Sequence, residues 1–343
     1  MPVRAVEARV RRHPWAWAIG TLLAVALLAG WWLWSKSQRY LQEGMDLLNI
    51  GRYADARSPL EQAKRWNPLS SRAGCGLKAI ELDAMRSDPE QLKPRLAEAT
   101  LQYPSCAYLK VLAGEQKYIN GDMGGALKDF EDAVQRERQL AEAHFDMGLT
   151  FDAQHNPDSA IEPYKTACDI SPHTARYCDN LADLYFRQGD YPAAIKVYGK
   201  TEQHPNSRLE LAKIYRLQRR LAEAAEREEE AIRWLNEPSA PDEQQNSWLV
   251  DKGANKPPVE LTEIKEKQCY AELELAVTEF LRRGDENATA SAVSAGFGKC
   301  ASRQEEVKAI LQWELRRLGS EVPQYTQRTD RFTEKFLAPA KAS

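Results

Sequence analysis

Six cysteines have the clearest chemical potential in this 343-residue chain, because a cysteine can form a disulfide, bind a metal or act as a nucleophile. No C-x-x-C pair occurs, so the sequence predicts neither a redox motif nor a covalent haem site. Cys168, His173 and Cys178 are evenly spaced, but no fourth ligand is visible near them. We therefore expect no metal site.

Motifs of catalysis are absent from the rest of the sequence. There is no glycine-rich phosphate loop, no G-x-S-x-G and no H-E-x-x-H. The five histidines are scattered, and the carboxylate run from Glu226 to Glu230 is typical of a solvated helix face. The formal net charge is −3, without the clustered basic face of a nucleic-acid binder. We expect a protein that is not an enzyme, needs no cofactor and does not bind nucleic acid.

The most apolar stretch lies close to the N-terminus, in residues 15–35. Trp15 to Trp34 is a run without a charge, which as a helix spans about 30 Å, the thickness of a bilayer core. Tryptophans stand at both ends, and four arginines precede the run. The pattern predicts a transmembrane helix that follows a basic cytoplasmic segment, residues 1–14. The part of the chain after the helix is then expected on the other side of the membrane, outside the cytoplasm. A cleaved signal peptide is the alternative, but Trp31 to Trp34 is a bulky exit for a peptidase.

After this span, one helix–turn–helix pattern recurs along the chain. Its best copy is Ala141 to Pro172, where Gly148 and Ala160 are small and two helices can therefore cross closely. Phe151 and Tyr164 fill the space on either side of that crossing. This pattern resembles a tetratricopeptide repeat, a helical hairpin of about 34 residues that stacks into a solenoid.

The resemblance covers residues 37–236 in about six repeats. The second repeat, about Ser71 to Tyr103, is degenerate, because the small residues of its first helix are hard to place. Each repeat buries its apolar face only against its neighbours. The resemblance therefore implies an all-α protein, a right-handed tetratricopeptide α-solenoid with an N-terminal transmembrane helix and a C-terminal helical cap.

The C-terminal third departs from the repeat pattern. Residues 237–258 are rich in proline and polar residues and are predicted as a loop. Inside it, Trp248-Leu249-Val250 is expected to dock on the solenoid, with a partner-binding tip as the alternative. Residues 259–320 are predicted as a helical hairpin and a capping helix, and residues 321–343 as a loosely held tail with a short helix.

The repeat geometry that the resemblance implies favours three disulfides. Cys75 and Cys106 are 31 residues apart, about one repeat, and so are Cys269 and Cys300. Of the remaining two, Cys168 lies near the end of the second helix of one repeat, and Cys178 lies in the first helix of the following repeat. The proposed pairs are Cys75–Cys106, Cys168–Cys178 and Cys269–Cys300. Six cysteines allow fifteen pairings, and the sequence alone does not choose among them. The alternative to disulfides is that all six are buried free thiols in a cytosolic protein.

The resemblance also implies a protein-binding groove, because the first helix of each repeat lines the inner surface of such arrays. Aromatic residues with a few charges at these places suit an extended peptide or a bound helix. The alternative is that these residues pack against each other or against the C-terminal helices. The predicted groove residues are Tyr108, Tyr118, Phe145, Leu149, Asp152, Arg176, Asp179, Asp183, Phe186 and Arg187, and the sixth repeat adds Lys213 and Arg216.

These observations predict a single-pass scaffold or adaptor of the bacterial inner membrane, with its repeats in the periplasm. It would bind proteins through its concave surface and the membrane through residues 15–35, and assist assembly, translocation or envelope export. One alternative is a structural accessory subunit of a larger inner-membrane complex, whose span packs against other transmembrane helices. Another is an organelle-membrane receptor with its repeats facing the cytosol.

Overall fold

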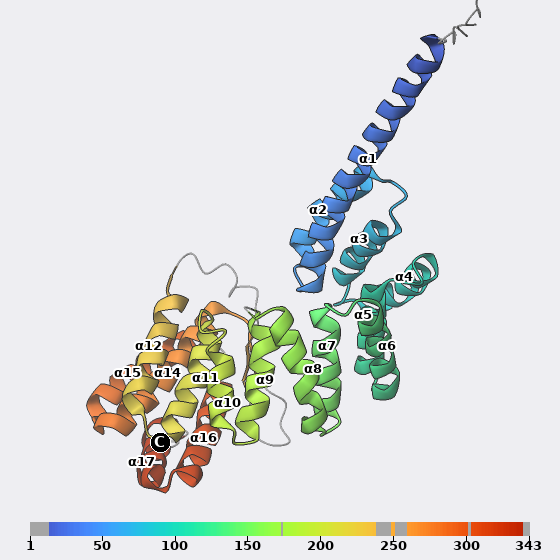
Figure 1. The fold of residues 1–343 in the computed structure, drawn as a ribbon. Coiled ribbons are helices and arrows are strands. Elements are labelled where there is room, and N and C mark those ends of the chain that lie inside the picture. The colour runs from blue at the N-terminus through green and yellow to red at the C-terminus, as the bar shows by residue number, and fades with distance from the viewer. Residues whose placement is uncertain (1–13, 173, 238–247, 251–258, 301–302, 339–343) are drawn as a thin grey trace, which may run out of the picture. The chain divides into compact units, whose positions relative to one another are not determined.

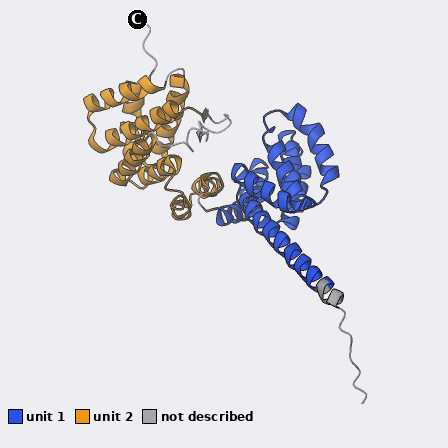
Figure 2. Cartoon of the chain, turned by 90° about the horizontal axis from the view of Figure 1, so that it is seen from above, with its two compact units in different colours: residues 1–171 blue, residues 172–343 orange. Residues whose placement is uncertain are grey.

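The computed structural model describes residues 14–172, 174–237, 248–250, 259–300 and 303–338 (Figure 1). The chain divides into two compact units, residues 1–171 and residues 172–343 (Figure 2). Each unit has a hydrophobic core of its own, built mainly from leucine, alanine and aromatic side chains.

Unit 1 begins with helix α1, Pro14–Asn49, which runs without a break from the predicted span into the first repeat (Figure 1). Its large apolar side chains from Leu22 to Trp34 are exposed, whereas Leu41 and Leu48 are buried in the core. Within the described part of the chain, no helix combines the length and the apolarity that a membrane span requires. Residues 1–13 of the predicted cytoplasmic segment, and the side chains of residues 14–18 and 20, lie outside the described ones.

The remaining helices of unit 1 form consecutive antiparallel pairs. They pack closely because a small residue stands where two helices cross: a Cβ on Gly148 would come within 2.5 Å of the Tyr164 ring. The helices are α2 (Tyr53–Trp66), α3 (Ser71–Asp83), α4 (Pro89–Gln102), α5 (Ala107–Ile119), α6 (Met123–Arg136), α7 (Ala141–Ala153) and α8 (Pro157–Ile170).

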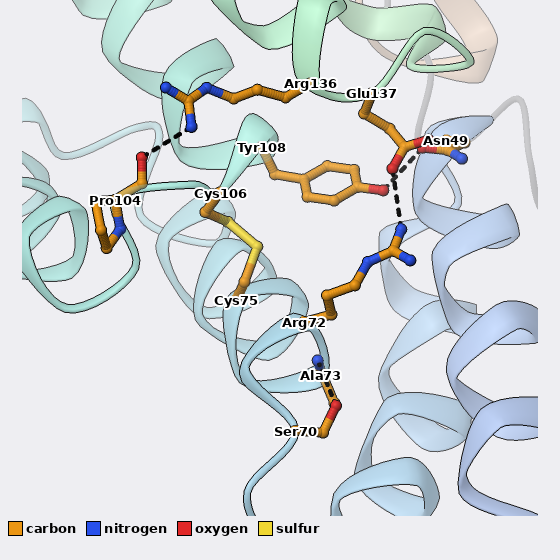
Figure 3. Close-up of a disulfide and its surroundings, with 10 residues drawn as sticks. All are labelled: Asn49, Ser70, Arg72, Ala73, Cys75, Pro104, Cys106, Tyr108, Arg136 and Glu137. Carbon is orange, nitrogen blue, oxygen red and sulfur yellow. Dashed lines mark hydrogen bonds and ion pairs between the residues drawn. A yellow bond between two sulfur atoms is a disulfide. The ribbon is translucent and has the colours of Figure 1, made fainter.

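The degenerate second repeat is the pair α3 and α4, and it packs unlike its neighbours. Helix α3 contacts α5 more extensively than it contacts its own partner α4. Cys75 in α3 is bonded to Cys106, the residue before α5, with their Cα atoms 5.7 Å apart (Figure 3). The disulfide therefore links two neighbouring first helices at the place where the repeat pattern is weakest.

Unit 2 continues with two more helix pairs and then the C-terminal helices. A disulfide between Cys269 and Cys300 joins α14 to the end of α15. The elements are α9 (Ala175–Arg187), α10 (Tyr191–Tyr198), α11 (Pro205–Leu217), α12 (Leu221–Leu235), β1 (Trp248–Val250), β2 (Val259–Leu261), α14 (Ile264–Arg283), α15 (Glu286–Lys299), α16 (Gln304–Glu321), the 3₁₀ turn η2 (Pro323–Tyr325), α17 (Thr326–Phe332) and the π-helical turn η3 (Thr333–Leu337).

Two of the three predicted cysteine pairs are thus joined, Cys75 with Cys106 and Cys269 with Cys300. Cys168 and Cys178 are disulfide-bonded as well, so none of the six thiols is free. Residues Cys168 and Cys178 belong to different units, and their pairing with each other stays a prediction.

The loop predicted over residues 237–258 contains a strand. Strand β1 pairs with β2 in an antiparallel ladder in which Trp248 lies opposite Leu261. The pairing satisfies backbone N–H and C=O groups that an irregular segment would leave to water. The prediction that the Trp248-Leu249-Val250 side chains dock on the solenoid falls outside the described residues, as do residues 238–247 and 251–258.

The expectation of a loose C-terminal tail is wrong for the described part of that segment. Phe332 and Leu337 are buried. The Phe332 ring lies 5.5 Å from Phe280 of α14 and 5.0 Å from Phe336, centroid to centroid. The tail is polar overall, but Phe332 and Leu337 belong to the core of unit 2 and Phe336 packs against it, and their burial fixes the segment on the cap. Residues 339–343 lie outside the described ones.

Candidate binding cavity in the second unit

Two aromatic residues predicted for the groove belong to the core of unit 1 instead. Tyr108 and Phe145 are each only 2% exposed. Tyr108 donates a hydrogen bond to Asn49, at 2.8 Å, and the Phe145 ring packs 5.7 Å from that of Tyr164. Repeat spacing places a residue on the inner side of its helix, but it does not show whether a neighbouring helix already covers that side.

Asp179 of α9 is also buried, and its partners give it a structural role. Its carboxylate accepts hydrogen bonds from Thr201, at 2.8 Å, and from Ser207, at 2.9 Å. Burial raises its pKa to about 6, although these two donors favour the charged form. Asp179 therefore ties α9 to the corner between α10 and α11.

The other predicted residues divide into two sets. Tyr118, Leu149 and Asp152 are partly buried on unit 1, and Arg176 lies on α9. The next turns of α9 carry Asp183, Phe186 and Arg187, which together line a cavity within unit 2. Of the predicted groove residues, these three on α9 and Lys213 and Arg216 on α11 line this cavity, and Tyr108 lines a second cavity in unit 1.

This cavity has a volume of about 340 Å³ and lies among α9, α11, α14 and α16. Helices α9 and α11 are the first helices of the fifth and sixth repeats, so their inner stripe forms one wall. The cap helices α14 and α16 supply the other wall, which converts an open groove into a pocket. The lining residues are Asn180, Asp183, Phe186, Arg187, Glu210, Lys213, Arg216, Leu217, Glu274, Val277, Leu311, Trp313, Glu314, Leu315, Arg317 and Leu318.

Charged side chains form the inner end of the cavity. The ammonium of Lys213 lies 2.7 Å from Glu210 and 2.9 Å from Glu314. The guanidinium of Arg216 is paired with Glu274 of α14 and lies 3.3 Å from Glu228 of α12. These ion pairs join the repeats to the cap, and removing one partner would leave an uncompensated buried charge.

Several carboxyl groups in and around this inner end have pKa values above their usual range. Burial raises the pKa of Glu314 to about 8, and the charge of Glu274 raises it further, against the effect of Lys213. Burial likewise raises the pKa of Asp183 to about 7, with Glu210 as the next cause. Burial also raises the pKa of Glu228 to about 7, although Arg216 opposes it. These raised pKa values predict that the three carboxyl groups titrate near neutral pH.

Aromatic and basic side chains form the outer end of the cavity. The guanidinium of Arg317 lies 4.5 Å from the Phe186 ring centroid and 5.8 Å from that of Trp313. Arg317 also pairs with Glu321 at 2.6 Å. This stack holds two aromatic faces at the entrance, the kind of side chain that dominates protein-binding hot spots.

Sequence reasoning missed the cap side of this site. The helical pattern predicts that Leu311 and Leu318 face inward, but it gives no signal for Glu274, Trp313 or Glu314. An acidic residue in an amphipathic helix is normally solvated. Its burial here depends on Arg216 and Lys213, which come from a different part of the chain.

Unit 1 has a second cavity, of about 670 Å³, beside the Cys75–Cys106 disulfide (Figure 3). Its charged side chains already have partners: Arg72 lies 3.2 Å from Glu137, and Arg136 donates to the Pro104 carbonyl oxygen at 3.2 Å. Its polar walls are therefore satisfied within the protein, and we favour the cavity of unit 2. Among the described residues, no group of three or more His, Cys, Asp or Glu side chains could hold a metal ion.

The tetratricopeptide repeat family matches residues 180–242 of this chain, which include α10, α11, α12 and most of α9. Two curated proteins are similar to it, both named protein O-mannosyl-transferase TMTC1. The mouse protein is 32% identical over 114 residues, which cover 31% of this chain and 12% of that protein. The human protein is 25% identical over 190 residues, which cover 53% of this chain and 21% of that protein. The chain thus spans about an eighth to a fifth of these relatives.

Several solved structures are also similar. PilF of Pseudomonas aeruginosa is 19% identical with a TM-score of 0.41, over 58% of this chain and 91% of that one. TTC0263 of Thermus thermophilus, a thermophilic TPR protein, is 24% identical with a TM-score of 0.35, over 52% and 98%. The human IFIT1 dimer with PPP-AAAA is 16% identical with a TM-score of 0.46, over 81% and 58%. At these TM-scores the likenesses carry no argument about function.

Proposed function

We propose that this chain, which carries tetratricopeptide repeats, is a scaffold that holds a partner protein in the cavity of unit 2 and catalyses no reaction itself. The observation that supports this most directly is the cavity of about 340 Å³ between the repeat helices and the cap. Its lining combines apolar and aromatic side chains with converging charged groups, which can take up part of a ligand and fix its orientation. Helical repeat arrays commonly use such concave surfaces for binding.

The two entrance aromatics provide the test of this proposal. Phe186 and Trp313 are partly exposed, so Phe186→Glu and Trp313→Glu should leave the fold intact and put a charge where a partner would pack. We expect each variant to lower partner capture at least tenfold, since a hot-spot aromatic is worth about 2 kcal/mol or more. Affinity purification from native membranes, with quantitative mass spectrometry, measures the capture.

The matched control is Leu69→Glu, because Leu69 is an apolar residue of unit 1 that is 92% exposed. It should capture as much partner as the natural chain. A photo-crosslinking amino acid at Trp313 should label the same partner, and a crosslink that forms only at Leu69 would contradict the proposal. Unchanged capture by both cavity variants would also refute it.

We further propose that residues 15–35 anchor the scaffold in a bacterial inner membrane, with the repeats in the periplasm. The support is the row of exposed apolar side chains on α1, which runs from Leu22 to Trp34 and covers a contiguous apolar surface. Lys36 lies 5.3 Å from the Trp32 ring, an arrangement suited to the boundary between lipid and water. Oxidised cysteines fit an exported location.

Fractionation tests this anchoring. The full chain should stay in the membrane pellet after carbonate extraction, and a chain that begins at Gln38 should move to the soluble fraction. A membrane-impermeant protease should digest residues 37–236 only after the outer membrane is opened. Digestion only after the inner membrane is broken would favour the alternative of a cytosolic face. A partner that co-purifies at fixed stoichiometry in mild detergent would favour the accessory-subunit alternative.

A further inference from the structure

We propose that the cavity of unit 2 recognises a single protonated side chain, a lysine or an arginine, that the partner carries between apolar neighbours. This inference rests on the proposed function, since it names the chemistry of the group that the cavity would bind. Three features support it: the charges at the inner end of the cavity, two carboxylate oxygens there and the apolar walls.

The inner end holds more acidic than basic groups. The basic residues at this end are Lys213 and Arg216, and their side chains are largely buried, with 14% and 5% of their surface exposed. Around them lie more carboxyl groups than two cations can neutralise. The carboxyl groups that line the cavity belong to Asp183, Glu210, Glu274 and Glu314, and Glu228 lies outside the lining, against Arg216. The other two basic residues of the lining are Arg187 and Arg317. Buried negative charge without a counterion is unfavourable, so some of these carboxyl groups hold protons near neutral pH, and a cationic ligand would take the place of a proton.

Two carboxylate oxygens at this end are available to a ligand. No N–H group and no hydroxyl among the described residues reaches Oε1 of Glu274 or Oε2 of Glu314, which are shielded from solvent, and the two carboxyl groups hydrogen-bond with each other through a shared proton. The Glu274 side chain is 2% exposed, and both residues line the cavity. An ammonium or guanidinium carries only donors, so it would satisfy both oxygens. An anionic ligand would instead meet these carboxylates directly.

The walls suit the stem of such a side chain. Leu217, Val277 and Leu318 line the cavity between the charged end and the entrance, and apolar walls accommodate methylene groups. A volume of about 340 Å³ is close to the lower limit of small-molecule sites, so it fits one side chain better than a length of peptide. Arg317 at the entrance is already paired with Glu321, which reduces its repulsion of an incoming cation.

Binding of a cation should displace a proton. The high pKa of Glu314, about 8, reflects its burial next to Glu274, so near neutral pH this pair holds a proton that a ligand ammonium would replace. Glu314 is faced by Lys213 on α11, Tyr270 on α14 and Arg216, while Asp183 is faced by Tyr198, Glu210 and Asp179. Affinity for the cation should therefore rise between pH 6 and pH 8.5 as these carboxyls lose protons.

Two matched tripeptides test the inference by calorimetry on the full chain in detergent micelles. The probes are acetyl-Leu-Lys-Leu-amide and acetyl-Leu-norleucine-Leu-amide, which differ in the ammonium group. At pH 8 we expect the lysine peptide to bind about tenfold more tightly, the change that one favourable ion pair produces. Its binding should release protons, which appears as a heat that depends on the ionisation enthalpy of the buffer.

Variants then assign the effect to the cavity. Glu274→Gln combined with Glu314→Gln keeps the shape of both side chains and should abolish the lysine preference and the proton release. Glu272→Gln on the same helix is the control, because Glu272 pairs with Lys299 and does not line the cavity. Circular dichroism and thermal unfolding establish that each variant is folded.

Equal affinity for the two peptides would overturn the inference, and so would a lysine preference that survives in the double variant. A third contrary result is no binding of the lysine peptide at 5 mM, roughly the weakest dissociation constant expected for a peptide held by such an ion pair. Its failure is distinguishable from failure of the proposed function. If Phe186→Glu still removes partner capture while the peptides show no charge preference, the cavity binds a partner by other chemistry.

Discussion

At the scale of single residues, the clearest result is that two aspartates one turn apart on α9 have different roles. Asp179 faces hydroxyl donors from Thr201 and Ser207, which bind it into the protein. Asp183 accepts a hydrogen bond from Tyr198 and also lines the cavity. Both residues are aspartates on the same side of α9, so the elements packed opposite each one determine its role.

The residue-scale prediction concerns Gly148, where α7 and α8 cross. A Cβ there would lie 2.5 Å from the Tyr164 ring, which is itself buried and cannot move freely. We expect Gly148→Ala to lower the free energy of unfolding by about 1–3 kcal/mol through overpacking. Chemical denaturation monitored by circular dichroism measures the change.

The control for this substitution is Gly124→Ala in α6. A Cβ at Gly124 meets nothing within 4 Å, so there the alanine should be neutral or stabilise by up to about 1 kcal/mol. If both alanines destabilise the protein equally, the loss is a property of the helix backbone and not of the crossing.

At the scale of elements, the cap helices α14 and α16 determine what the inner surface can do. They place Glu274 and Glu314 against Arg216 and Lys213, and they shield all four from water. Without the cap, the same stripe of α9 and α11 would be an open charged groove. Burial beside Glu274 raises the pKa of Glu314, and this makes the site sensitive to pH.

The element-scale prediction is a pH dependence of stability. Since the folded-state pKa of Glu314 (about 8) and those of Asp183 and Glu228 (about 7 each) are raised, the folded state binds more protons than the unfolded one above about pH 4. The free energy of unfolding should therefore fall as pH rises from 5 to 8, by at most about 1.4 kcal/mol per pH unit and group. Lys213, whose pKa is raised well above its ordinary value, stays charged over this range and contributes a constant amount.

Calorimetric unfolding at pH 5, 6, 7 and 8 tests this dependence. Glu314→Gln should flatten the profile between pH 6 and 8, because the amide cannot titrate. Glu306→Gln, on the same helix but 48% exposed, should leave the profile as it is. A stability that increases from pH 6 to pH 8 in the natural chain would show that the sign is wrong.

At the scale of the whole molecule, the chain builds two cores, each within one unit. The core of unit 1 extends from Leu41 to Ala143, and that of unit 2 from Leu209 to Leu337. In unit 2, repeat residues and cap residues share a single core, so the cap is part of the folded unit and not an appendage. Two disulfides lie within units, one in each.

The whole-molecule prediction is that a chain ending at Glu237 keeps unit 1 and loosens the repeats of unit 2. Removal of the cap exposes Leu209 and Leu235, which should cost about 3–6 kcal/mol for the two side chains. Hydrogen exchange should then become faster in α11 and α12, while α5 to α7 stay protected. Equal acceleration in both sets of helices would contradict two separate cores.

The sequence alone was sufficient for the helical hairpins, since glycine and alanine at crossings, aromatic residues beside them and proline or asparagine at helix ends act locally. It also predicted the cysteine pairs Cys75–Cys106 and Cys269–Cys300 from their spacing of about one repeat. That spacing brings two neighbouring first helices together in the former pair and the two helices of one hairpin in the latter. The strand at Trp248 and the packed tail at Phe332 were missed, since each depends on a partner distant in the chain.

The tertiary structure alone decided which part of the predicted inner stripe forms a site. Repeat spacing gives the side of a helix on which a residue lies, but burial depends on what covers that side. Neighbouring helices bury Tyr108 and Phe145, and the cap leaves a cavity beside Asp183, Phe186 and Arg187. The acidic wall of that cavity comes from α14 and α16, whose carboxylates would be assigned to solvent until Lys213 and Arg216 are placed against them.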